Sequence, residues 1–367
     1  MKELIDLRAL NSIATLIAVM VMSCGETPVP PPELSTCGDA WKVAFTVPDE
    51  LVPRQVVWSD GRVYYSALSV PPLGSGIIPA DSAIRSLPAE GGSAVTLVHD
   101  WATSLWIEPD RILYAKGQEL FSAPRAGGDP SRLAGKVRTT EVGPPLSLQQ
   151  TVDGTALYYD ELAERAREPA TLWRSDFGST ASQMLAQLTF PGNVGVGHLI
   201  PWDDDILAVG IGGAALLVAK VGGAPRPVGA DLGVFVAAGD GAMLWSESSG
   251  LNGDKRTFTM RRSGRDGGDA RLFWRDKPAT LEPTFATYGA GGQWLIAAYE
   301  RFADGADHVA VWHLDDAGNK RIACDPSPWR PSTGHPTQLI VAPDGFYVVL
   351  GDNPVGSFSW SLVRIPR

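Results

Sequence analysis

The sequence has few cysteines, few charged residues and no long apolar run. Its 367 residues include 3 cysteines, and charged residues make up 20% of the chain. The most apolar stretch, residues 13–22, is too short to span a bilayer comfortably. No apolar spacing of helical period extends over a useful length, which argues against a parallel-sheet fold with crossover helices.

Basic charge is also scarce. The formal net charge is −10 at pH 7, and the longest basic run is Arg261-Arg262. A surface of this charge repels a polyanion such as DNA. We therefore expect no nucleic-acid partner.

Motifs of nucleophilic catalysis and of metal binding are missing. There is no G-x-S-x-G elbow, so an enzyme would need catalytic residues scattered over the fold. His308 and His313 lie five residues apart on one expected strand, so they point to opposite faces. Residues 203–205 fit a hairpin turn better than a calcium site, and 304–308 is only a slightly better calcium candidate. We expect no cofactor and no metal.

Glycine and proline, by contrast, are abundant. The chain contains 40 glycines, 29 prolines and 12 tryptophans. Many glycines and prolines with few charges favour short strands joined by tight turns.

A unit of strand, turn and strand recurs along the chain. Asp-Gly between apolar runs is a strong hairpin signal, because both central residues of that turn need positive φ. A third strand follows each hairpin, and a second glycine turn follows most of them, as in "SLPAEGG" (86–92) and "SAPRAGG" (122–128). The seven hairpin turns lie at Asp60, Asp110, Asp153, Asp204, Asp240, Gly291 and Asp344.

This repeat predicts an all-β fold, a seven-bladed β-propeller of four-stranded antiparallel blades, as one domain over residues 39–367. The last repeat ends after its third strand, and residues 40–47 form a strand that no repeat uses. We predict that this N-terminal strand completes the last blade and closes the ring, which leaves no blade with an open edge.

The repeats resemble those of TolB-like and YWTD-like propellers. The resemblance rests on the strands Val63-Tyr64-Tyr65-Ser66, Leu113-Tyr114-Ala115 and Leu157-Tyr158-Tyr159-Asp160. It covers about residues 40–367, although no repeat has a complete Tyr-Trp-Thr-Asp sequence. A TolB-like propeller implies partners in the cell envelope, but no motif identifies the residues that would bind them.

The N-terminus has the layout of an export signal. Residues 1–23 place Lys2 and Arg8 before the apolar stretch, and Val21-Met22-Ser23-Cys24 resembles the bacterial lipobox. Residues 24–38 then read as a lipidated Cys24 followed by a proline-rich tether. The resemblance to lipoproteins makes the outer membrane the expected location, because Gly25 is not the aspartate that retains enterobacterial lipoproteins at the inner membrane. A plain secretory signal or an anchor helix is the alternative.

Ligands of propellers usually bind at the entrance formed by the fourth-to-first and second-to-third strand loops. Aromatic, His and charged side chains on one face suit a binding site. The alternative is that these loops pack on one another and that the tryptophans fill gaps between blades. The candidate entrance residues are His99, Trp101, Arg138, Glu141, His198, Trp329, Arg330 and His335.

A disulfide between Cys37 and Cys324 is also expected. With Cys24 acylated, these are the two remaining thiols of an exported protein, where disulfides persist. Strand twist brings the end of one outer strand toward the start of the next.

The sequence favours a lipid-anchored binding or protein-interaction module of the cell envelope. It would be a monomer that binds an envelope protein or a glycan and meets the membrane only through its N-terminal lipid. Two alternatives stay open. One is a propeller lyase or hydrolase with its site at the central entrance, and the other is a propeller that binds carbohydrate or peptidoglycan.

Overall fold

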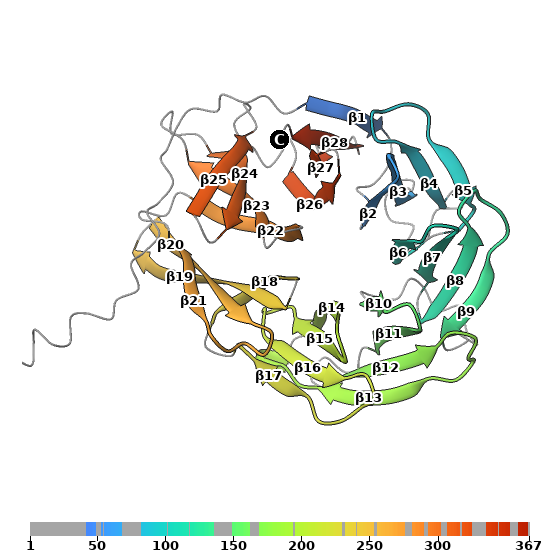
Figure 1. The fold of residues 1–367 in the computed structure, drawn as a ribbon, viewed down its shortest axis with the longest axis horizontal. Coiled ribbons are helices and arrows are strands. Elements are labelled where there is room, and N and C mark those ends of the chain that lie inside the picture. Colours follow the sequence, from blue (N-terminus) through green and yellow to red (C-terminus); the bar gives the residue numbers. More distant parts are fainter. Residues whose placement is uncertain are drawn as a thin grey trace, which may run out of the picture.

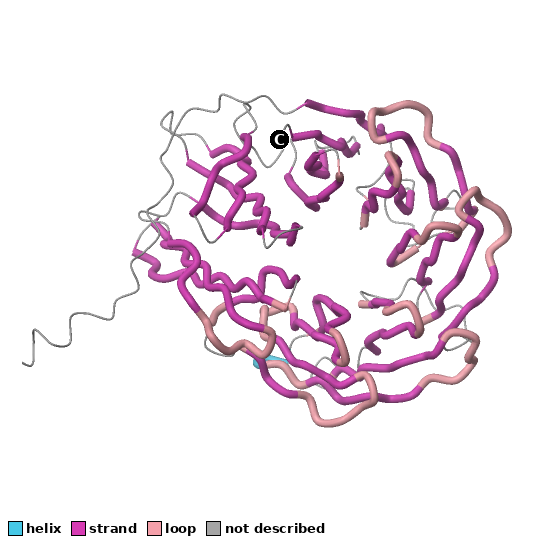
Figure 2. The backbone as a smooth tube through the Cα atoms, viewed as in Figure 1, coloured by secondary structure: helices cyan, strands magenta, loops and turns pink. Residues whose placement is uncertain are grey.

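The computed structural model consists almost entirely of strands (Figure 2). Its described residues contain one short 3-10 helix, η1 (Pro191–Asn193), and none of their helices is long and apolar enough to cross a membrane. The structure describes residues 42–48, 53, 55–67, 82–100, 102–116, 118–135, 149–161, 169–193, 195–229, 232–239, 241–252, 255–275, 281–289, 293–301, 307–315, 318–324, 335–343, 345–352 and 359–365.

The strands form four-stranded antiparallel sheets arranged around a common axis (Figure 1). This arrangement confirms an all-β propeller with four-stranded blades. The first four sheets in chain order are blade 1 with β2 (Val56–Ser59), β3 (Arg62–Ala67), β4 (Ala83–Pro88) and β5 (Val95–Val98); blade 2 with β6 (Ser104–Ile107), β7 (Arg111–Lys116), β8 (Glu119–Pro124) and β9 (Ser131–Gly135); blade 3 with β10 (Gln150–Val152), β11 (Ala156–Glu161), β12 (Ala170–Asp176) and β13 (Gln183–Leu188); and blade 4 with β14 (Val196–Trp202), β15 (Asp205–Gly210), β16 (Ala215–Ala219) and β17 (Arg226–Val228).

Three further sheets complete the set of seven among the described residues. They are blade 5 with β18 (Val234–Gly239), β19 (Ala242–Asn252), β20 (Lys255–Gly264) and β21 (Arg271–Arg275); blade 6 with β22 (Leu281–Gly289), β23 (Gln293–Arg301), β24 (Asp307–Asp315) and β25 (Gly318–Cys324); and blade 7 with β26 (His335–Ala342), β27 (Gly345–Asp352), β28 (Ser359–Ile365) and β1 (Lys42–Pro48).

β1 joins the start of the described chain to its end. It pairs antiparallel with β28, from Lys42 opposite Arg364 to Pro48 opposite Ser359. In Figure 1, β1 is the outermost strand of the sheet that also contains β26, β27 and β28. The predicted strand over residues 40–47 thus lies at 42–48 and supplies the fourth strand of this blade.

The up-and-down order of strands gives the ring two distinct faces. We call the face with the fourth-to-first and second-to-third strand loops the entrance face, and the face with the first-to-second and third-to-fourth turns the turn face. The predicted third-to-fourth turns are confirmed in two blades, because β4 ends at Pro88 before β5 and β8 ends at Pro124 before β9.

Aspartate shapes the hairpin turns of the turn face. Asp60 and Gly61 have φ values of 48° and 70°, so both central residues adopt the left-handed conformation expected for Asp-Gly. Asp203 has a φ of 50°, which places the acidic stretch 203–205 at a turn as predicted.

The hydrophobic core lies between blades rather than within them. Each of the seven clusters of described buried residues combines the facing sides of two neighbouring sheets. In one cluster, Tyr65 of blade 1 packs edge to face on Trp360 of blade 7, with ring centroids 4.9 Å apart. Because successive residues of a strand point to opposite sides, each blade contributes to two clusters.

Backbone hydrogen bonds add a second link between blades. The turn after the third strand donates an N–H to the outer strand of the preceding blade, from Gly128 to Leu97 (3.1 Å) and from Gly223 to Leu185 (3.3 Å). Gly178 donates to Leu133 in the same way at 2.6 Å. The repeated glycine turns of the sequence are therefore contacts between blades.

Candidate functional site

Most of the predicted entrance residues lie outside the described part of the chain. Their side chains therefore neither support nor contradict a common binding site. These residues are Trp101, Arg138, Glu141, Trp329 and Arg330, and the lipidation candidate Cys24 also lies outside.

The three candidate histidines lie toward the entrance face. His99 is exposed in the loop between blades 1 and 2. His198 and His335 were predicted in loops, and this was wrong, because His198 belongs to β14 and His335 is the first residue of β26. Both strands contain an irregularity next to these residues, where the register shifts. An extra residue of this kind lengthens the strand beyond its alternating pattern.

The loop of residues 99–103 is held by side chains of blade 1. The Ala102 N–H donates to Ser66 Oγ at 3.0 Å, and Ser66 is a buried residue near the end of β3. Strand β6 begins where the loop ends, and its Leu105 N–H donates to Gln55 Oε1 at 2.9 Å. Each of these two bonds gives a side-chain acceptor to a backbone N–H that does not bond to a neighbouring strand.

Blades 2 and 3 hold the same loop. Thr103 donates its N–H to the carbonyl of Ala115 in blade 2 at 2.8 Å. Its hydroxyl donates to Oε1 of the buried Gln150 in blade 3 at 2.6 Å. The end of this loop, at Ala102 and Thr103, is thus fixed from three blades, as suits a binding element on a rigid support.

A polar cluster on the entrance face is centred on Asp100 of this loop. Asp100 accepts hydrogen bonds from the Tyr114 hydroxyl (3.1 Å) and from Lys116 Nζ (2.9 Å). Burial, together with the charge of Asp100, holds the pKa of Tyr114 well above its ordinary value. The hydroxyl therefore stays protonated at neutral pH and acts as a hydrogen-bond donor. The sequence analysis missed this cluster, although Asp100 lies between two predicted entrance residues.

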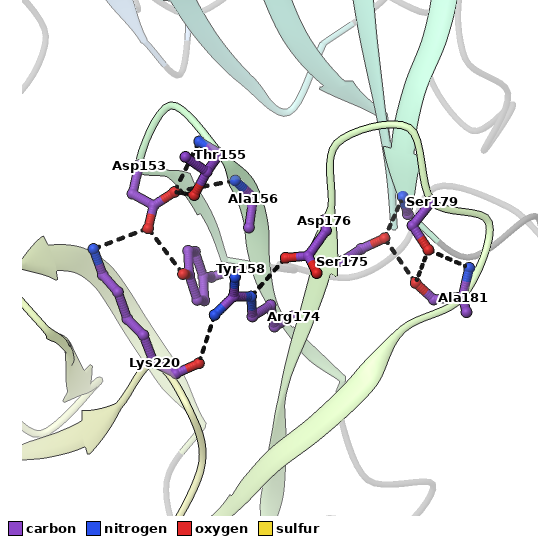
Figure 3. Close-up of polar contacts among 11 residues, drawn as sticks. Asp153, Thr155, Ala156, Tyr158, Arg174, Ser175, Asp176, Ser179, Ala181 and Lys220 are labelled. Carbon is purple, nitrogen blue, oxygen red and sulfur yellow. Dashed lines mark hydrogen bonds and ion pairs between the residues drawn. The ribbon is translucent and has the colours of Figure 1, made fainter.

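A second cluster joins blades 3 and 4 at the turn face (Figure 3). Lys220, which follows β16, extends back to Asp153 in the hairpin turn of blade 3, with Nζ and Oδ2 2.9 Å apart. Both side chains are largely buried, at 18% and 11% exposure. Tyr158 donates its hydroxyl to the same carboxylate at 2.9 Å.

Asp153 is held in its charged form. Burial alone would raise the pKa of this carboxyl, but hydrogen bonds from Lys220, Thr155 and Tyr158 outweigh burial and lower the pKa well below its ordinary range. Lys220 Nζ and the Arg174 guanidinium both lie 5.9 Å from the centre of the Tyr158 ring, where a cation is attracted to the π electrons. The charged and polar groups of this cluster provide one another with hydrogen bonds and counter-charges. Because they come from blades 3 and 4, they hold these two blades together.

The same device recurs at the junction of blades 1 and 2. Arg125, which follows β8, donates to the Tyr64 hydroxyl (3.0 Å) and to Ser59 Oγ (2.9 Å). It also pairs with Asp60 at 2.7 Å and stacks 5.4 Å above the centre of the Tyr64 ring.

Blades 4 and 5 are joined in a related way. Arg265, which follows β20, pairs with Asp203 and donates to the carbonyl of Trp202 at 3.0 Å. We call these three contacts, made by Arg125, Lys220 and Arg265, the basic clamps. Blade 3 has Phe177 at the corresponding position, where it packs against the core shared with blade 2.

The described residues contain no group of three or more His, Cys, Asp or Glu side chains that could hold a metal ion. His308 and His313 both lie on β24, with an odd separation that points them to opposite sides of the sheet, as predicted. The other calcium candidate, 304–308, lies largely outside the described residues.

The disulfide stays a prediction. Cys324 is buried, at 1% exposure, at the end of the outer strand β25. Cys37 lies outside the described residues. Mass spectrometry of peptides from the unreduced protein will test the pair.

Comparison with known proteins supports the architecture. No family model matches the sequence, and no curated protein matches it. Among solved structures, "YCF48 bound to D1 peptide" aligns over 92% of this chain and 98% of its own, with a TM-score of 0.52 and 10% identity. YCF48 from Cyanidioschyzon merolae gives the same score and identity over 89% and 98%. BamB from Moraxella catarrhalis aligns over 89% and 100% with a TM-score of 0.41 and 13% identity. Similarity at this level of identity shows the fold alone.

Proposed function

We propose that this propeller is a protein-binding module that is exported and anchored in the cell envelope through a lipid on Cys24. Its partner docks on the entrance face. The fold supports a binding role, because propellers of this shape include YCF48, whose solved structure contains a D1 peptide. Fold alone does not define a site, so the proposal depends on the entrance face itself.

One observation carries the proposal, namely the loop of residues 99–103 held by three blades. Ser66 of blade 1 and Gln150 of blade 3 accept hydrogen bonds from Ala102 and Thr103, and Gln55 accepts one from Leu105 just after the loop. A loop fixed in this way loses less conformational entropy when a partner binds, and the exposed His99 lies at its start. On the turn face, by comparison, each basic clamp pairs its charge with an aspartate of the preceding blade.

Substitution of the loop tests the entrance face. We expect His99→Ala with Trp101→Ala to reduce capture of an envelope protein at least tenfold, about 1.4 kcal/mol, with little change in melting temperature. The measurement is quantitative affinity capture from envelope extracts, compared with wild type. Arg226→Ala, a change of an exposed residue on the outer strand β17, is the control. Undiminished capture by the double variant, or retention of a glycan in place of a protein, would contradict the proposal.

Substitution of the acylated cysteine tests the anchor. Cys24→Ala should move the protein from the membrane fraction to the soluble envelope fraction, because the proline-rich tether separates the lipid from the folded domain. The melting temperature should stay unchanged. Persistent membrane association at high salt would show that Cys24 is not the anchor. Density separation of the two membranes tests the outer membrane as its location.

A further inference from the structure

In three blades the outer strand contains a bulge that the next blade covers. The pairing with the third strand leaves out Leu97 in β5, Leu133 in β9 and Leu185 in β13. A bulge frees one residue from the ladder. Each of these three carbonyls accepts an N–H from a glycine in the turn of the following blade. That turn therefore covers the outer edge of the blade before it and takes up the freed acceptor.

Blade 5 has the same bulge without this cover. Met260 pairs with Trp274 and Arg261 pairs with Leu272, so the pairing leaves out Phe273 of β21. In the part of the chain that the structure describes, no other blade donates a hydrogen bond to the Phe273 carbonyl. The outer edge of blade 5 thus keeps a backbone acceptor where three earlier blades have theirs covered.

The length of the turn in blade 6 explains this difference. In blade 2 the last pair of the third and fourth strands is Ser122 with Ser131, and the eight residues 123–130 lie between them. The turns of blades 1, 3, 4 and 5 have the same length. Blade 6 follows blade 5 around the ring (Figure 1), and there Asp315 pairs with Gly318, so two residues close the hairpin. A two-residue turn only reverses the chain, and it does not extend sideways over β21.

The uncovered edge also belongs to a basic part of an acidic protein. β20 and β21 contain six Lys or Arg and no Asp or Glu. The outer strands β1, β5, β9, β13 and β17 contain at most one basic residue each. The acidic residues nearest to β20 and β21 in the chain are Glu247, Asp254, Asp266, Asp269 and Asp276. With all of these included, residues 247–277 contain eight basic and five acidic residues, a formal charge of +3 compared with −10 for the whole chain.

We propose that the outer edge of blade 5 binds an acidic, extended segment of a partner protein as a fifth strand. The segment donates a backbone N–H to the Phe273 carbonyl, as the turns of other blades do, and places acidic residues opposite Arg271 and Arg275 at the two ends of β21. Strand addition takes its affinity from backbone hydrogen bonds and its specificity from side chains. Basic residues on an edge deter neutral and basic strands, so they select an acidic one.

This surface is separate from the proposed docking site on the entrance face, because β21 is the outermost strand of its blade. The inference therefore goes beyond the proposed function and adds a second contact. The edge offers backbone hydrogen-bonding groups as well as positive charge. An extended acidic peptide is complementary to both, whereas a nucleic acid or an anionic membrane matches only the charge.

Fluorescence anisotropy with the full-length protein tests the proposal. The probe is a labelled peptide whose central strand reads Glu-Val-Thr-Val-Glu, so that acidic residues begin and end a strand as long as β21. We expect saturable binding that weakens by about tenfold or more when Lys replaces both Glu residues. A peptide with the same side chains but N-methylated backbone amides keeps its charge and loses the donors of the ladder. It should also bind about tenfold more weakly, or less well still.

Matched variants show where the peptide binds. Arg271→Glu with Arg275→Glu should weaken binding of the Glu peptide by about tenfold or more and create binding of the Lys peptide, because the charges are exchanged. Lys42→Glu with Arg226→Glu makes the same change at exposed residues of β1 and β17, and should leave binding of the Glu peptide unchanged. Melting temperatures check that both double variants fold.

A longer turn in blade 6 tests the role of the cover. Replacement of residues 316–317 by a copy of residues 177–182, the turn of blade 3, should cover β21 and block the Glu peptide. The exchange removes one acidic residue and adds no charge. Weaker binding of an acidic peptide would therefore follow from the cover and not from the charge.

Three results would overturn the proposal. They are equal binding of the N-methylated peptide, undiminished binding by the variant with Glu at 271 and 275, and displacement of the peptide by duplex DNA or anionic vesicles as readily as by unlabelled peptide. Dimerisation of the wild type that the same variant abolishes would make a second copy the occupant instead. His99→Ala with Trp101→Ala should bind the peptide as wild type does, so a failure of this proposal is distinguishable from a failure of the proposed function.

Discussion

The residue that directly follows the third strand decides how a blade holds the turn face of the blade before it. Arg125, Lys220 and Arg265 occupy this position in three blades and reach the carboxylates of Asp60, Asp153 and Asp203. The position has a fixed location because its N–H is itself bonded, for example from Lys220 to the Asp204 carbonyl at 2.9 Å. A long basic side chain there points across the junction.

Removal of one buried partner should be costly. We expect Lys220→Met to lower the free energy of unfolding by about 3 kcal/mol, because Asp153 remains buried without its counter-charge. Chemical denaturation measures the change. Arg226→Met, which breaks an ion pair whose arginine is 63% exposed, should cost less than about 1 kcal/mol. Equal effects of the two substitutions would show that the clamp adds nothing to stability.

The same pair makes a prediction about acid stability. Folding lowers the pKa of Asp153, so its contribution is present above the ordinary carboxyl pKa of about 4 and is lost as the pH falls toward the folded value. We expect wild type to lose stability between about pH 4 and pH 2 more steeply than Asp153→Asn. Denaturation midpoints measured across this range test it. Parallel profiles would contradict the assignment.

Among the elements, the glycine turns show why the sequence repeats itself. Gly91 follows β4 with a φ of +99°, and a Cβ there would lie 2.9 Å from the carbonyl oxygen of Ala44 in β1. The turn of blade 1 thus rests on the closing strand of blade 7. No side chain fits between them.

Gly91→Ala should therefore destabilise the protein by about 2 kcal/mol, through backbone strain and displacement of β1. Gly61→Ala is the matched control, because Gly61 has a φ of +70° and nothing within 4 Å of its Cβ position. It should cost about 1 kcal/mol, from strain alone. Thermal unfolding compares the two. A Gly91→Ala cost no larger than that of Gly61→Ala would rule out a tight contact with β1.

Elements with a strong local signal could be predicted from the sequence. Asp60-Gly61 specifies its turn by conformation alone, and the strand over 40–47 followed from counting strands. The starts of β14 and β26 could not be placed, because their irregularities depend on pairing with the second strand of the blade.

The basic clamps correspond to a sequence pattern from which no prediction was made. A basic residue two positions before a glycine pair occurs in residues 125–128, 220–223 and 265–268. Its meaning depends on an acidic turn in the preceding repeat, which becomes visible only when consecutive turns are aligned. Blade 1 has Ala89 at this position and blade 3 has Phe177, so the pattern covers only some junctions.

At the scale of the whole molecule, β1 is the element on which the ring depends. Phe45 packs edge to face on Trp360 with centroids 5.5 Å apart, and Val47 packs against the core shared by blades 1 and 7. Without β1, one edge of β28 loses its partner, and exposed edges promote association.

Deletion of residues 40–47 should abolish cooperative unfolding or cause aggregation. Sedimentation and calorimetry of the truncated protein will show this. A matched deletion of eight residues from the tether, 25–32, should leave both properties unchanged. A monomer with an unchanged melting temperature after loss of 40–47 would mean that the ring is stable without its closing strand.

The pairing of β1 with β28 also determines when during synthesis the ring can close. The hydroxyls of Thr46 and Ser361 are 2.8 Å apart, yet 315 residues separate them along the chain. At roughly 5–20 residues per second of synthesis, β1 exists for about 16–60 seconds before its partner has been made. During that interval each completed blade can pack against the next one, whereas Phe45 and Val47 still lack the blade 7 residues against which they pack. Among the described strands, the first to be made is therefore the last to pair, and the ring stays open until the end of the chain has been made.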